Sequence, residues 1–219
     1  MRIIRSGLFI SLFLSILATG CATVQPYDYT TYRQSHPRSI LVLPPVNNSP
    51  DVHATYSLYS QLAYPLAESG YYIFPVALVD ETFKQNGLTA PADIHAVAPA
   101  KLQQIFGADA ALYVVITQYG STYTIINSAA VVTASAKLID LKNGNLLWQG
   151  SATASSEESQ GNSNGGLAGL LITAIVNQIA NNITDASYRV AGITSQRLLL
   201  ARQPNGILNG PRSPNYGKD

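Results

Sequence analysis

The chain is poor in the residues on which most site chemistry depends. Among its 219 residues there are one cysteine and three histidines, so an intramolecular disulfide is impossible and candidate metal ligands are few. Charged residues make up only 11% of the chain, with 13 basic against 12 acidic side chains. Because no basic patch that would neutralise phosphates is present, nucleic acid is not expected as a partner.

Long apolar runs are also scarce, and the N-terminal one is short. Leu8 to Leu17 follows two arginines, which is typical of a signal peptide, and it is too short to cross a bilayer as a stable helix. Small residues then lead into Cys21. This pattern resembles the lipobox of bacterial lipoproteins, with Ala18 where such motifs usually carry leucine. An ordinary secretory signal and an uncleaved membrane anchor are the alternatives.

Acylation gives the lone thiol of Cys21 a purpose, because several acyl chains on one residue make membrane attachment effectively permanent. The residue after the cysteine is Ala22. By resemblance to the sorting rules of diderm bacteria, the absence of aspartate there favours the outer membrane. We therefore predict a lipid anchor in the outer membrane, with the domain facing the periplasm and the covalent lipid on Cys21 as the only attached group.

Cleavage before Cys21 removes two arginines and changes the formal net charge from +1 to −1, with 11 basic against 12 acidic residues. About 199 residues remain, enough for one domain with a proper core. We predict a signal peptide over 1–20, a lipidated tether over 21–37, a single domain over 38–202 and a flexible tail over 203–219. The tether is polar and dotted with tyrosines, for which docking on a partner is the alternative.

The first half of the domain predicts a parallel unit. Ser39 to Leu43 is a short apolar run, which favours a buried strand. Apolar residues then recur at helical spacing between Val52 and Leu66, and Tyr71 to Pro75 indicates a second strand. Because strand, helix and strand connect through a right-handed crossover, the two strands are expected to be parallel neighbours.

The second half predicts an antiparallel hairpin. A helix from Pro99 to Phe106 precedes a strongly apolar strand, Ala110 to Tyr119. Alternating segments over 130–141 and 146–154 then flank Asn143-Gly144, a strong hairpin turn signal. The predicted fold class is α/β, with a mixed sheet that has a parallel β-α-β start and an antiparallel hairpin, and with helices packed on it.

A further apolar segment, Leu167 to Ile183, lies near the C-terminal end and is interrupted by asparagine and glutamine. It predicts one or two helices packed on the sheet, which continue with helical spacing over 186–200. An oligomer-forming or membrane-surface element is the alternative.

Four blocks of sequence carry a family resemblance. Arg38 to Pro50, Tyr64 to Tyr72, Asp80 to Gly87 and Phe106 to Leu112 are similar to blocks in a family of proteobacterial lipoproteins related to a meningococcal vaccine-candidate antigen. The resemblance implies a fold like the N-terminal domain of TolB, which is shared with CsgG and PelC, two lipoproteins that work as rings at the outer membrane. It brings no catalytic residues.

Few residues are candidates for a catalytic, metal or phosphate site. His36, His53 and His95 show no ligand spacing, and the glycine-rich segment Gly161 to Gly169 lacks the lysine of a phosphate loop. We therefore predict no enzyme activity and no metal site.

Two segments are candidate interaction surfaces. The first is the loop after the first strand, because α/β sheets often place their working surface at the carboxyl ends of strands; its residues are Pro44, Pro45, Asn47, Asn48 and Asp51. The second is the apolar C-terminal segment, with Leu167, Leu171 and Ile175. Both patterns also suit purely structural roles.

The sequence thus predicts a non-enzymatic outer-membrane lipoprotein that acts as a protein-interaction component of an envelope export or assembly complex. Its partners would be the membrane, through the lipid, and other envelope proteins, and near-zero net charge permits a homo-oligomer. The alternative is a periplasmic module that binds a glycan or small molecule through its tyrosines. A hydrolase that uses His53 is a third, weaker hypothesis.

Overall fold

The computed structural model describes residues 27–123, 128–159, 186–201 and 203–219. Its strands are β1 (Ser39–Val42), β2 (Val46–Asn47), β3 (Tyr72–Ile73), β4 (Ala110–Tyr123), β5 (Ser128–Asp140) and β6 (Leu146–Ser155). Its helices are α2 (Thr30–Ser35), α3 (Ala54–Glu68), α4 (Val76–Gln85), α5 (Pro91–His95), α6 (Pro99–Phe106), the 3₁₀ turn η1 (Ser156–Ser159) and α8 (Ala186–Leu199).

The predicted parallel unit is confirmed. Strands β1 and β3 run parallel, with Ser39 opposite Tyr72 and Ile40 opposite Ile73, and α3 connects them. The helix begins two residues after Val52 and ends two residues after Leu66, with Pro65 inside its last turn.

A single mixed sheet joins these strands to the hairpin, in the order β3-β1-β4-β5-β6, with β2 paired to β4. β1 is parallel to β4, and the pairs β4–β5 and β5–β6 are antiparallel. The predicted Asn-Gly turn connects β5 to β6. There Asp140 Oδ1 accepts the backbone N–H of Lys142 at 2.7 Å, and Gly144 takes the positive φ of 75° that a side chain disfavours.

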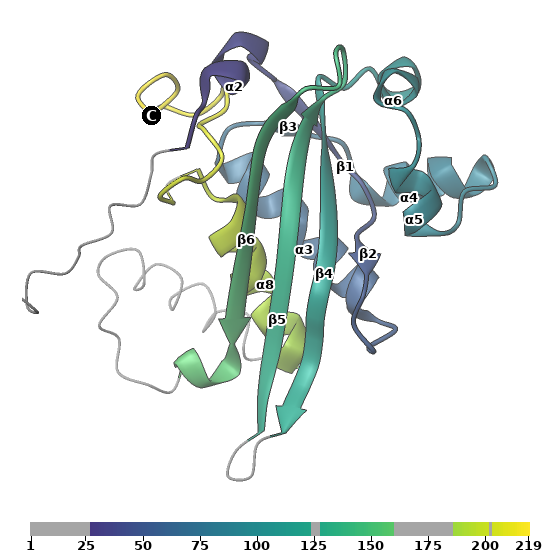
Figure 1. The fold of residues 1–219 in the computed structure, drawn as a ribbon, viewed down its shortest axis with the longest axis vertical. Coiled ribbons are helices and arrows are strands. Elements are labelled where there is room, and N and C mark those ends of the chain that lie inside the picture. The colour runs from purple at the N-terminus through teal and green to yellow at the C-terminus, as the bar shows by residue number, and fades with distance from the viewer. Residues whose placement is uncertain (1–26, 124–127, 160–185, 202) are drawn as a thin grey trace, which may run out of the picture.

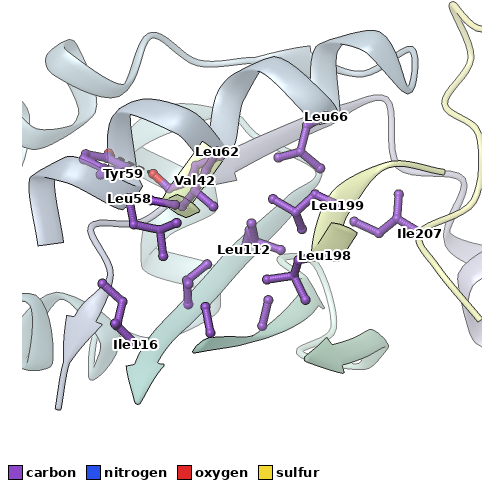
Figure 2. Packing of buried hydrophobic residues seen from close by; sticks show 14 of the residues in the cluster. Val42, Leu58, Tyr59, Leu62, Leu66, Leu112, Ile116, Leu198, Leu199 and Ile207 are labelled. Carbon is purple, nitrogen blue, oxygen red and sulfur yellow. Dashed lines mark hydrogen bonds between the residues drawn. The ribbon is translucent and has the colours of Figure 1, made fainter. Parts of the chain in front are cut away.

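The two faces of the sheet are covered unequally. On one face α3 and α8 pack against the sheet and bury the larger core (Figure 1). Figure 2 shows leucines from both helices meeting Leu112 and Ile116 of β4, and the Tyr59 hydroxyl donating to the carbonyl of Val42 at 2.9 Å. On the other face α4, α5 and α6 bury a smaller core around Leu41 and Leu43. The described residues leave open the part of that face formed by β4, β5 and β6.

The predicted tether over 21–37 is wrong for residues 27–37, which belong to the folded domain. Tyr32 in α2 is buried, and its hydroxyl lies 2.7 Å from that of Tyr71. The Tyr29 hydroxyl donates to the carbonyl of Gly206 at 2.5 Å. These tyrosines find their apolar partners in distant parts of the chain, which a local reading of polar sequence does not see. Residues 21–26 lie outside the described part.

The predicted flexible tail over 203–219 is also wrong, because its backbone bonds to the domain. The Gly210 N–H donates to the carbonyl of Ser69 at 2.7 Å, and the Arg212 N–H donates to that of Gly70 at 3.0 Å. The chains touch so closely that a Cβ on Gly70 would lie 2.4 Å from the Ser213 nitrogen. Ile207 is buried at 1% exposure, so one apolar anchor and a set of backbone hydrogen bonds order a segment rich in proline and glycine.

Candidate functional site

The loop after β1 contains five of the predicted interaction residues, and two of them are too buried to contact a partner. Pro44 and Pro45 are buried, and their carbonyls accept from His95 Nε2 at 3.0 Å and from Thr55 Oγ1 at 3.3 Å. They end the strand and fill the space beneath α3 and α5, so their prediction as surface residues is wrong. Leu167, Leu171 and Ile175 lie outside the described residues.

The rest of the loop is held by its own side chains. Asn47 Nδ2 donates to the Asp51 carbonyl at 2.7 Å, and Asn47 Oδ1 accepts the Ser49 N–H at 2.8 Å. Asp51 Oδ1 accepts the N–H of His53 at 2.8 Å, and the Asn48 N–H donates to the Ile116 carbonyl of β4 at 2.9 Å. Asn47 and Asp51 therefore organise the loop rather than offer their side chains to a partner.

Apolar side chains at the end of this ordered loop face solvent. Val52 is 81% exposed, and Tyr56, in the first turn of α3, is 51% exposed. Together with the exposed Asn48 they form what we call the loop patch. The sequence singled out the loop but not Val52 or Tyr56, because both continue the helical spacing of core positions.

An open groove of about 620 Å³ lies on the uncovered face of β4, β5 and β6. We call it the sheet groove; it is lined by His95 of α5 and by Tyr113, Val115, Ser135, Lys137, Gln149 and Ser151, among others. Its polar lining residues alternate with buried core residues along each strand, so one face of each strand packs the core and the other faces the groove. No sequence motif pointed to this site. The alternation around Ser135 and Lys137 was the available signal.

His95 forms one wall of the groove. Its ring lies 5.2 Å from that of Tyr113 in an edge-on arrangement. Since the Pro44 carbonyl only accepts, Nε2 must carry the proton in the hydrogen bond between them. Burial lowers the pKa of His95 below its usual 6.5, and the bond to the carbonyl partly offsets this. The three histidines do not converge, and across the described ranges no three His, Cys, Asp or Glu side chains gather as a metal site requires.

The lowered pKa predicts a loss of stability in mild acid. Near pH 6.5 and below, the unfolded chain binds a proton at His95 more readily than the folded chain does, so the free energy of unfolding falls as the pH drops from 6.5 towards the lower folded pKa. In His95→Gln, whose amide still donates to Pro44, this part of the decline should disappear. Urea unfolding at pH 7.5 and 5.5 measures it, and an equal decline in both proteins would contradict the assignment.

Among the helices that the structure describes, none combines the length and apolar content needed to cross a bilayer.

The chain matches a known protein family. The family model described as "Putative lipoprotein GNA1162-like" matches residues 27–212. A protein of Neisseria meningitidis serogroup B (strain ATCC BAA-335 / MC58), described as "Putative lipoprotein NMB1124/NMB1162", is 52% identical over 201 residues, which are 90% of this chain and 93% of that relative.

One solved structure supports this match. The crystal structure of lipoprotein GNA1162 from Neisseria meningitidis is 55% identical and covers 67% of this chain and 100% of its own, with a TM-score of 0.54. A PelC dodecamer from Paraburkholderia phytofirmans is more distant, at 16% identity over 74% of this chain and 87% of that one, with a TM-score of 0.41. The resemblance drawn from the four sequence blocks is confirmed. With its mixed α/β fold and a match across most of its length, the chain belongs to the GNA1162-like lipoprotein family.

Proposed function

We propose that this protein is a non-enzymatic lipoprotein of the outer membrane that faces the periplasm and binds other envelope proteins within an export or assembly complex. Its relatives are named as lipoproteins and none is named as an enzyme. The lipobox-like segment ending at Cys21 supplies the anchor. The loop patch is the observation that carries the proposal.

The loop patch suits a protein partner because its exposed apolar side chains are already ordered. Val52 and Tyr56 together expose an aliphatic and an aromatic side chain, and the loop beneath them is tied to β4 through Asn48. A preorganised loop loses little conformational entropy on binding, so more of the contact energy appears as affinity. Aromatic side chains are also enriched among the residues that dominate protein interfaces.

Two substitutions in this patch test the proposal. The double variant Val52→Ser, Tyr56→Ser should lower the recovery of crosslinked envelope partners from intact cells by about tenfold, since central apolar contacts each contribute roughly 1–2 kcal/mol or more. The matched control is Ile105→Ser in α6, which also removes a half-exposed apolar side chain, 45% exposed in the protein. α6 lies at the other end of the molecule from β2 and its loop (Figure 1).

The measurement is crosslinking of the full lipidated chain, mild detergent extraction, and the mass and identity of the complexes. The proposal is supported if an envelope partner that is recovered with the wild type is lost from the double variant but is still recovered with Ile105→Ser. A complex made of this chain alone identifies a homo-oligomer. Equal recovery from the double variant and the wild type, with equal melting temperatures, would contradict the role of the patch.

Ligand binding is the second candidate function, and the sheet groove favours it. The groove has the size of a small-molecule site and a mixed polar and aromatic lining. It lies beside the loop, since β2 pairs with β4 at Val46 and Val115. A periplasmic binding module would use this face.

A further inference from the structure

The polar side chains of the sheet groove form two rows across three strands. Tyr113 of β4 pairs with Lys137 of β5, which pairs with Gln149 of β6. In the next row Val115, Ser135 and Ser151 occupy the equivalent positions. Neighbouring strands are about 4.8 Å apart and alternate residues of one strand about 6.8 Å apart. Such a grid of separated polar groups suits a ligand with many hydroxyl groups better than a single small ion.

Apart from the ring contact between Tyr113 and His95, these side chains have no polar partner within the described part of the protein. The Tyr113 hydroxyl and the side chains of Ser135, Lys137, Gln149 and Ser151 make no hydrogen bond or ion pair there. In the row below, by contrast, the Oγ1 atoms of Thr133 and Thr153 lie 3.1 Å apart and satisfy each other. The groove therefore presents a contiguous set of donors and acceptors to whatever enters it.

Charge selects the ligand further. Among the described residues that line the groove, Lys137 is the one lysine or arginine, and none is aspartate or glutamate. The Lys137 ammonium takes part in none of the three ion pairs found among the described residues. A lysine facing a groove without a carboxylate favours an anionic ligand, because a charge-assisted hydrogen bond to a ligand carboxylate is about twice as strong as a neutral one.

An aromatic platform stands at one end of the first row. Tyr113 is half-buried and is held edge-on by His95, with ring centroids 5.2 Å apart. Burial raises the pKa of its hydroxyl, so the group remains a donor at neutral pH. A fixed aromatic face of this kind packs against the apolar C–H face of a sugar ring while its hydroxyl remains available for a hydrogen bond.

We infer that the sheet groove binds an oligosaccharide that carries carboxylate groups. Lys137 pairs with a carboxylate, Ser135, Ser151 and Gln149 bond to sugar hydroxyls, and the Tyr113 ring packs against a sugar face. This inference rests on the second candidate function, ligand binding, and adds the chemical class of the ligand. It is independent of the loop patch.

Titration calorimetry of the full-length lipidated protein in detergent micelles tests it, with trigalacturonic acid as the probe and its methyl ester as the uncharged counterpart. The acid should bind and the ester should bind at least about tenfold more weakly, since the ester lacks the charge that Lys137 meets. Lys137→Met should weaken binding of the acid by a similar factor, while Lys137→Arg, which keeps the charge, should stay within about threefold of the wild type.

Lys142→Met is the matched control, because Lys142 is exposed in the β5–β6 turn and outside the groove; it should leave the affinity unchanged. Equal binding of acid and ester, or equal binding by wild type and Lys137→Met, would overturn the inference while leaving ligand binding intact. If neither saccharide binds at millimolar concentration, the inference falls together with the glycan form of the second candidate function, and the loop-patch proposal is unaffected.

Discussion

Replacing Cys21 with alanine is expected to move the protein from the membrane fraction to the soluble periplasmic fraction. Cys21 is the only thiol in the chain, so its loss removes the single point at which a lipid can be attached through sulfur. Each buried CH₂ group contributes about 0.8 kcal/mol to membrane binding, and several acyl chains make attachment effectively permanent. Fractionation of cells and metabolic labelling with palmitate measure the change.

Ala18→Leu is the matched control, because it alters the same segment in the direction of the usual lipobox. It should leave both membrane attachment and labelling in place. A wild-type protein found at the mass of the uncleaved chain would identify an uncleaved anchor instead, and a wild-type protein that takes up no palmitate would contradict lipidation.

The described part of the domain begins at Tyr27, six residues after Cys21 in the sequence. The Tyr27 N–H donates to Asn205 Oδ1 at 3.1 Å, which fixes this point of the chain to the domain. Six extended residues reach at most about 20 Å. A lipidated Cys21 would therefore hold the domain next to the bilayer, and partners of the loop patch or the sheet groove would have to be reached near the membrane surface.

Replacing Trp148 with alanine is expected to cost about 3–5 kcal/mol of the free energy of unfolding, the usual range for emptying a large aromatic site. Trp148 lies on β6, is buried at 1% exposure, and packs so closely over Gly150 that a Cβ there would lie 2.4 Å from Cζ2 of the indole. Its Nε1–H also donates to the carbonyl of Asn205 at 2.9 Å. The variant therefore loses core packing and the link to the C-terminal segment together.

Trp148→Phe separates the two effects. It keeps an aromatic ring in the core but loses the bond to Asn205, so a cost of about 1–2 kcal/mol is expected for the hydrogen bond together with the smaller ring. Urea unfolding followed by circular dichroism gives the free energies, and limited proteolysis between 203 and 219 reports release of the segment. An alanine variant within about 1 kcal/mol of the wild type, with an uncut segment, would show that Trp148 does not hold these parts together.

Most elements of the sheet were predictable because their signals are local. The apolar run of β1 and the alternation around Asn143-Gly144 depend on residues next to one another, and the structure places strands there. The helix over 186–200 was likewise confirmed as α8. The short strand β2 shows where local signals end, because it has two residues and only its pairing with β4 defines it.

The candidate sites were less predictable because exposure is decided by distant contacts. Pro44 and Pro45 were expected at the surface, yet α3 and α5 cover them. The sheet groove exists because α4, α5 and α6 stop short of β5 and β6. No sequence pattern in those strands predicts how far the helices extend over the sheet. Lys137, Gln149 and Tyr113 are far apart in the chain, and the strand register alone brings them into one row.

The sequence by itself determined the lipobox-like segment at Cys21, the mixed sheet with its parallel start and antiparallel hairpin, and membership of a lipoprotein family, since each depends on contiguous residues. The tertiary structure decided where the domain ends and which side chains remain exposed. Residues 27–37 and 203–219 are polar or rich in proline and glycine, and they are ordered only because Tyr32 meets Tyr71 and Gly210 meets Ser69. Such contacts join residues that are far apart along the chain, so no local sequence pattern predicts the free energy that they contribute.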